Sequence, residues 1–105
     1  ARAFAYDLAA LVLAQETIRL GLDQQLTTVE KSFLYLPFMH SESLAIHEQA
    51  VELYNIAGLE FNLKFELKHK VIIERFGRYP HRNIVLGRTS ITEEMLFLQQ
   101  ADSSF

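Results

Sequence analysis

Apolar residues recur every three or four positions along most of the chain, which is the spacing of one face of an α-helix. In the first part of the chain Phe4, Leu8, Leu11 and Ile18 follow this spacing, and six alanines add helix propensity. Gly21 is a natural end for such a helix, because glycine readily adopts the left-handed conformation of a helix C-terminus. We therefore predict a first helix that ends near Gly21.

A second helix is predicted to begin at Thr27. Residues 27–30 read Thr-Thr-Val-Glu, the pattern of a capping box. In this motif the Thr27 hydroxyl and the Glu30 carboxylate would each accept a hydrogen bond from a backbone amide that has no partner within the helix. The residues that follow are apolar on nearly all sides, which predicts a central, buried helix. Pro37 should end or kink this helix, because proline has no amide hydrogen and clashes with the preceding turn.

A third helix is predicted from Ser41 or Ser43 to Ala57, just before Gly58. A last helix is predicted near residues 90–93, where Ser-Ile-Thr-Glu is another capping-box pattern. Between these two lies a stretch with two interpretations. Residues 61–67 alternate between apolar and polar types, as in a strand, yet the same apolar positions continue along one helical face to Phe76. The pattern alone favours the helix and leaves the strand open. Residues 78–83, around Pro80, are predicted to form an ordered loop.

Composition narrows the class of protein. The chain has 105 residues, 50% of them apolar, which fits a single globular domain. Cysteine is absent, which excludes disulfides and cysteine-bound metals. The net charge of −3 makes nucleic acid an unexpected partner, and no apolar stretch suggests a membrane span. We expect a cytoplasmic protein, and we predict no cofactor.

Charge is segregated along the chain in a way that allows a local anion site. Residues 1–63 hold eight acids and three bases, whereas residues 64–88 hold seven bases and two acids. Four arginines of the basic stretch flank the Pro80 loop, where guanidinium groups would suit a phosphate or carboxylate. The alternative, equally weighted, is that these arginines pair with the acidic first part of the chain or point to solvent.

Histidines provide two further candidate sites. His40 and Glu42 precede His47 and Glu48 by one to two turns, close enough for acid–base chemistry or a metal. The spacing does not match the His-Glu-x-x-His zinc motif, so we favour the interpretation that these residues form a helix N-terminus and predict no metal. His69 lies between two lysines, and we interpret it as a lone surface histidine.

Several strings resemble a known family. They are FLYLPFMHSE at residues 33–42, RFGRYPHRN at residues 75–83, Leu-Gly-Arg at 86–88, Arg-Ala-Phe-Ala at 2–5 with Asp7, and Ser-Ser-Phe at 103–105. They resemble the signatures of a bacterial family known only as domain of unknown function nine-two-four. The resemblance implies an all-helical, tetratricopeptide-like fold, which favours helix at 61–67, and a longer full-length relative with further chain before Ala1. Two positions depart from the pattern: His47, where relatives tend to have Gln, and Val71, where Asp is expected.

Together these observations predict an all-α domain of about five helices, stacked as antiparallel pairs in a right-handed, tetratricopeptide-like arrangement, at the C-terminal part of a longer chain. The favoured function is a helical scaffold that binds a protein or another ligand. The alternative is an enzyme or small-molecule binder acting on a phosphate or carboxylate. We also predict a homodimer through the face of Phe4, Leu8 and Leu11. The candidate ligand-binding residues are His40, Glu42, Arg78, His81, Arg82 and Asn83.

Overall fold

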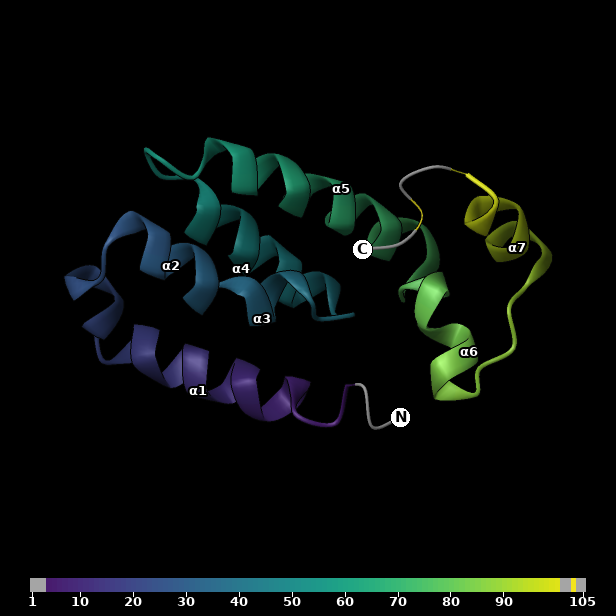
Figure 1. The fold of residues 1–105 in the computed structure, drawn as a ribbon, viewed down its shortest axis with the longest axis horizontal. Coiled ribbons are helices and arrows are strands. Elements are labelled where there is room, and N and C mark those ends of the chain that lie inside the picture. The colour runs from purple at the N-terminus through teal and green to yellow at the C-terminus, as the bar shows by residue number, and fades with distance from the viewer. Residues whose placement is uncertain (1–3, 101–102, 104–105) are drawn as a thin grey trace.

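The computed structural model describes residues 4–100 and Ser103 (Figure 1). Every regular element within these residues is a helix, so the predicted all-α fold is confirmed and residues 61–67 are helical. Five described α-helices have seven residues or more, close to the predicted count, and two others are single turns. No helix in the described part of the chain has the length and apolar character to cross a membrane. The tetratricopeptide-like stack stays a prediction.

Residues 7–39 form two neighbouring rows of helix. Helix α1 (Asp7–Arg19) is followed by a 3₁₀ turn (Leu22–Gln25), by α2 (Thr28–Leu34) and by the single turn α3 (Leu36–Met39). The predicted capping box is confirmed. The Thr27 hydroxyl accepts a hydrogen bond of 3.2 Å from the Glu30 amide, and the Glu30 carboxylate accepts one of 2.9 Å from the Thr27 amide. Helix α1 lies along α3, as Figure 1 shows.

The prediction of a second helix buried on all sides is wrong for α2. Val29 and Phe33 on this helix are 66% and 67% exposed. The chain turns at Tyr35, so the apolar residues beyond that point belong to α3 and face a different direction. Pro37 lies in the first turn of α3, where its missing amide hydrogen costs nothing. The buried part of this segment is therefore Tyr35, Phe38 and Met39.

Helices α4 (Leu44–Tyr54) and α5 (Glu60–Phe76) form a hairpin with more extensive contact than any other pair of described elements. The Ser43 hydroxyl caps α4 by accepting the Ile46 amide, as one of the two predicted starts requires. Gly77 ends α5 with φ +69°, a conformation that side chains other than glycine rarely adopt. The main core forms where α1, α3 and α4 meet, from seven buried residues: Ala14, Tyr35, Phe38, Met39, Ala50, Tyr54 and Leu59.

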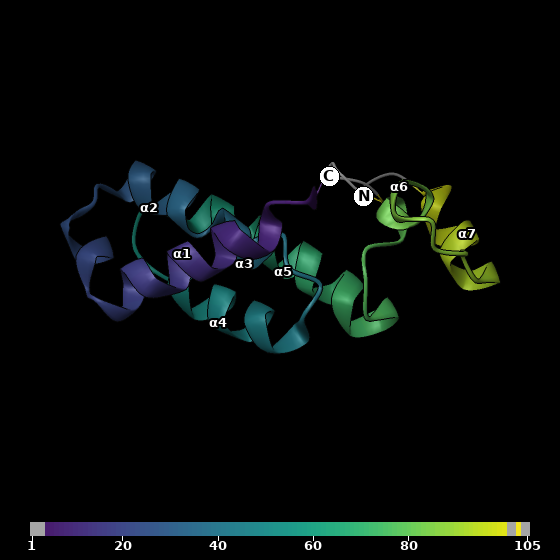
Figure 2. The same ribbon diagram turned by 90° about the horizontal axis from the view of Figure 1, so that it is seen from below.

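The chain after α5 forms a separate group at one end of the molecule, clearest in Figure 2. The predicted loop around Pro80 is a 3₁₀ turn, η3 (Pro80–Arg82), followed directly by the single turn α6 (Asn83–Leu86) and later by α7 (Thr92–Leu98). The N-cap of α7 is Ile91, one residue beyond the predicted Ser90. The Glu94 carboxylate, and not that of Glu93, accepts the capping hydrogen bond, from the Ile91 amide. Ile72, Ile73 and Tyr79 form a second, smaller core here.

Candidate functional site

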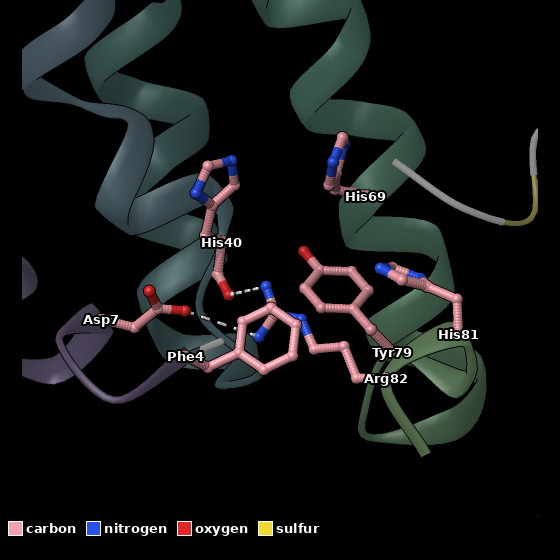
Figure 3. A pocket seen from close by; sticks show the side chains of 7 residues that line it. All are labelled: Phe4, Asp7, His40, His69, Tyr79, His81 and Arg82. Atoms are coloured by element: carbon pink, nitrogen blue, oxygen red, sulfur yellow. Dashed lines mark hydrogen bonds and ion pairs between the residues drawn. The ribbon is translucent and has the colours of Figure 1, made fainter. Parts of the chain in front are cut away.

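A cavity of about 290 Å³ lies where the end of α3, the middle of α5 and the η3 turn approach the start of α1 (Figure 3). We call it the histidine cavity. These segments are far apart in the sequence. The side chains that line the cavity are Phe4, Asp7, His40, His69, Tyr79, His81 and Arg82.

Arg82 is the cation of this cavity and is only 9% exposed. Its guanidinium carbon lies 4.3 Å from the ring centroid of Phe4 and 4.8 Å from that of Tyr79, so the group is held by cation–π contacts with two rings. Its Nη2 donates to the His40 carbonyl oxygen at 2.9 Å. Its Nε is buried and has no hydrogen-bond partner. A buried donor left unpaired in this way costs stability and calls for an explanation.

The nearest carboxylate to Arg82 is Asp7, and the contact is loose. The Asp7 Oδ2 lies 3.9 Å from Arg82 Nη1, beyond hydrogen-bond distance, and the Asp7 side chain is 45% exposed. Figure 3 shows Asp7 at the edge of the group, with Arg82 between it and Tyr79. Asp7 is therefore a counterion near Arg82 that accepts no hydrogen bond from the guanidinium.

Three imidazoles surround the same space, from His40 at the exposed rim to the buried His69, with the half-buried His81 beside Tyr79. Removal from water lowers the pKa of all three, and the positive charge of Arg82 lowers the pKa of His40 and His81 further. For His69 the pKa falls to about 4, chiefly through burial. These rings are therefore neutral near pH 7.

Hydrogen bonding determines which nitrogen of His69 carries the proton. Its Nδ1 lies 2.7 Å from the Phe65 carbonyl oxygen, which can only accept, so Nδ1 is the donor. The basic nitrogen of the neutral ring is consequently Nε2. A proton taken up by His69 would go to that atom and turn the ring into a cation.

Tyr79 separates the histidine cavity from a second polar group, the His47–Glu66 network. The Tyr79 hydroxyl donates to the Met39 carbonyl at 2.6 Å and lies 2.9 Å from His47 Nε2. His47 Nε2 also lies 2.6 Å from the Ser41 carbonyl, so this nitrogen carries a hydrogen. On its other side, Nδ1 lies 2.8 and 3.0 Å from the two oxygens of the Glu66 carboxyl group.

The His47–Glu66 network shares one proton between a ring and a carboxyl group. Because Nε2 holds a hydrogen already, the contact at Nδ1 requires a further proton, on the imidazole or on Glu66. Either arrangement leaves the pair with no net charge. Burial raises the pKa of Glu66, and the hydrogen bond from His47 opposes that rise. Both side chains are fully buried, so the network holds α4 to α5 out of contact with solvent.

A family model described as "Bacterial protein of unknown function (DUF924)" matches residues 1–102. The chain belongs to this bacterial family. A solved structure of a protein of unknown function from Agrobacterium tumefaciens is similar, with 39% identity and a TM-score of 0.89. The match covers 94% of this chain and 56% of the Agrobacterium protein, so the chain spans little more than half the length of that relative. No curated protein matches the chain.

In this DUF924 protein, three of the six predicted site residues line the histidine cavity: His40, His81 and Arg82. Glu42 lies next to them and lines an adjoining hollow on the other side of Arg82. Its carboxylate accepts two hydrogen bonds from Arg88, at 2.8 and 3.0 Å, and one from the Tyr79 amide at 2.6 Å. Glu42 therefore fixes the loop that carries the cavity residues.

The other two predicted residues do not line the cavity. Arg78 donates to both oxygens of Glu94, at 2.7 and 2.8 Å, and thereby holds the pKa of Glu94 at about 2. Asn83 is fully buried, donates to the Ser90 hydroxyl and accepts from Arg88. Arg78 and Arg82 therefore do not both face the histidine cavity.

Sequence reasoning missed four lining residues of this DUF924 protein. The interpretation of His69 as a surface residue is wrong, since it is 5% exposed and faces the cavity. The helical spacing of the sequence could have indicated its burial. Ile72 and Ile73, three and four positions later on the same face of α5, are buried as well. Phe4, Asp7 and Tyr79 lay inside the strings that resemble the family, with nothing local to mark a role. Among the described residues no three histidine, aspartate or glutamate side chains are placed so that they could hold one metal ion.

Proposed function

We propose that this DUF924 protein binds a small anionic ligand in the histidine cavity, with Arg82 as the cation that holds it. One observation carries the proposal. A nine-tenths buried guanidinium lines the cavity, its Nε has no partner, and the carboxylate nearest to it among the described residues, that of Asp7, lies beyond hydrogen-bond distance. A ligand oxygen that accepts from Arg82 would satisfy the unpaired donor and supply the close counterion.

The rest of the cavity supports a small ligand. Its volume of about 290 Å³ is at the lower end of the range for small-molecule pockets. The aromatic rings of Phe4 and Tyr79 hold the guanidinium in place, so little side-chain entropy is lost when a ligand binds. The neutral imidazoles add groups that can donate or accept a hydrogen bond.

Thermal unfolding with and without candidate anions tests the proposal. The panel contains inorganic phosphate, phosphorylated metabolites, and mono- and dicarboxylates at matched ionic strength. A ligand at 100 times its Kd should stabilise the native state by about 2.7 kcal/mol. For a domain of this size that is a rise in Tm of several degrees.

A pair of variants separates site binding from a general salt effect. Arg82→Met keeps a long side chain between the two rings and removes the charge, so the rise in Tm should disappear. Arg19→Met is the matched control, since Arg19 lies on the surface and pairs only with the exposed Glu16. No shift with any anion, or an equal shift in the Arg82 variant, would contradict the proposal.

A second candidate is the protein-binding scaffold, and the partner we propose for it is a second copy of the chain, as in the separate prediction of a homodimer. The observation that favours it is an apolar outer face on α1, where Leu8, Val12 and Leu13 are 72%, 53% and 69% exposed. Of the three residues predicted for the dimer, only Leu8 is exposed. Phe4 contacts Arg82, and Leu11 packs against the main core. Sedimentation velocity of the wild type and of Leu13→Glu tests the dimer, which the charge should dissociate.

A further inference from the structure

We infer that the anion carries a phosphoryl group, as free phosphate or a phosphate monoester, bound as its dianion, which displaces Asp7 from Arg82 and brings one proton onto the histidine cluster. The inference rests on the proposed function and names its ligand class. It starts from the directions in which the polar groups face the cavity.

The polar groups approach the cavity from several sides. His40 follows α3, His69 projects from α5, and His81 and Arg82 come from the η3 turn; Figure 3 shows them around a common space. A phosphoryl group presents three terminal oxygens in a tetrahedral arrangement, so it can accept hydrogen bonds from donors that converge from different directions. A carboxylate has two oxygens in one plane and suits a single arginine fork. The arrangement therefore fits a phosphoryl group better.

Charge balance explains why a proton accompanies the ligand. Without a ligand the described lining residues carry one positive charge, on Arg82, and one negative charge, on Asp7, beside neutral imidazoles. A dianion that takes the place of Asp7 leaves an excess of negative charge, which favours the protonated form of a neighbouring imidazole. Free protein, ligand dianion and one proton thus combine into a complex with an imidazolium. The proton comes from solvent and forms a second N–H bond on the imidazole, and no bond within the ligand forms or breaks.

The other ionisable groups near the cavity do not supply that proton or that charge. From α4 and α5, His47 and Glu66 satisfy each other behind the Tyr79 ring. The Glu42 carboxylate, at the start of α4, is held by Arg88 from the segment after α6. The Tyr79 phenol has its pKa raised, chiefly by burial, and stays neutral. Among the described lining residues, the groups that can respond to the ligand are Asp7, His40, His69 and His81.

Asp7 gives the inference a test that a merely structural role would not pass. Its carboxylate competes with the ligand for Arg82, and its side chain is exposed enough to turn away. Asp7→Asn removes the competing charge and keeps the shape. Because like charges a few ångströms apart repel, phosphate should bind about three- to tenfold more tightly to this variant.

Isothermal titration calorimetry of the full chain is the deciding experiment. The probes are phenyl phosphate and inorganic phosphate, with sulfate and succinate for comparison, in Tris and Bis-Tris at pH 7. Proton uptake makes the binding enthalpy depend on the ionisation enthalpy of the buffer. We expect phenyl phosphate to bind more tightly than succinate, with an uptake of up to one proton. We also expect affinity to increase up to about tenfold for each unit that the pH falls, while the ligand stays a dianion.

Variants of the histidines identify the acceptor of the proton. His69→Asn keeps a donor for the Phe65 carbonyl and should reduce proton uptake. If it fails to fold, His40→Gln and His81→Gln provide the same measurement. Succinate binding as tightly as phosphate, heats that do not depend on the buffer, or an Asp7→Asn variant with no gain would each overturn the inference and leave the proposed function standing. The absence of any binding that Arg82→Met abolishes would overturn both.

Discussion

Two groups of polar side chains lie on opposite sides of the Tyr79 hydroxyl and ring, and they differ in how completely their hydrogen bonds are satisfied. In the His47–Glu66 network both ring nitrogens of His47 have partners at 2.6 to 3.0 Å, and both side chains are fully buried. In the histidine cavity, Arg82 Nε has no partner and the nearest carboxylate is loosely placed. Histidines are present in both groups.

The difference shows that residue type alone does not mark a binding site. A polar network whose donors and acceptors are all paired stabilises one arrangement of helices and has nothing left to offer a ligand. A polar group with an unpaired buried donor is less stable than it could be, and proteins commonly accept such a cost at functional sites. We therefore assign the His47–Glu66 network to the fold and the histidine cavity to binding.

The largest expected effect is on the satisfied side of Tyr79. His47→Ala removes the partner of Glu66, the donor to the Ser41 carbonyl and the contact with the Tyr79 hydroxyl. Breaking a buried pair in this way should lower the free energy of unfolding by about 3–5 kcal/mol, measured by urea denaturation.

Glu66→Gln is the matched control for that loss. The amide side chain of this variant can donate to His47 Nδ1 while Nε2 keeps its hydrogen, so no polar atom of the His47 ring is left unpaired. We expect a loss of less than about 1.5 kcal/mol, the size of one net hydrogen bond. Equal losses in the two variants would mean that the charge of the pair, which Glu66→Gln removes without changing the side-chain volume, holds α4 to α5.

The next effect is a pH dependence that comes from the cavity side. The pKa of His69 is about 4 in the folded protein against 6.5 when it is exposed. Between these values the unfolded chain binds a proton that the native protein does not, so stability is complete above about pH 6.5 and falls as the pH drops toward 4. The shift corresponds to a loss of about 3 kcal/mol. The lowered pKa values of His40 and His81 act in the same direction.

Urea denaturation between pH 7 and pH 3 measures this slope, and a variant identifies its source. His69→Asn should flatten the curve between pH 6.5 and 4. The loss that follows at lower pH should remain, because Glu94, with a pKa of about 2, loses its interaction with Arg78 only as the pH falls from 4.5 toward that value. A wild-type stability that stays constant from pH 6.5 to 4 would contradict the burial of a neutral His69.

The local features of this fold could be predicted from sequence because their causes are local. The capping box at Thr27, the cap at Ser43 and the helix end at Gly77 each depend on a few neighbouring residues. The cap of α7 was misplaced by one residue for a reason that is not local. The Ser90 hydroxyl accepts a hydrogen bond from Asn83, and the helix begins after Ile91 instead.

The candidate site was only partly predictable, because it depends on contacts between distant segments. His40, His81 and Arg82 could be named by residue type and by their place beside prolines. Their convergence with Phe4, Asp7 and His69 results from the packing of α1 and α5 against the η3 turn, which no local pattern encodes. The two lysines beside His69 suggested solvent, although one face of α5 is buried along its second half.

The smallest expected effect distinguishes the two sides of Tyr79 most sharply. Arg82→Met keeps an extended side chain between the rings of Phe4 and Tyr79. It loses the cation–π contacts with both rings, the loose pairing with Asp7 and one hydrogen bond, to the His40 carbonyl. It also removes a buried charge and the unpaired Nε, and both of these cost stability in the wild type. The opposing contributions should leave the free energy of unfolding within about 1 kcal/mol of the wild-type value.

Arg19→Met at the exposed pair with Glu16 is the control, and it should change the free energy of unfolding by about as little. Only the Arg82 variant should lose anion binding. A loss of about 3 kcal/mol or more at Arg82 would instead place this arginine with the His47–Glu66 network, as part of the fold.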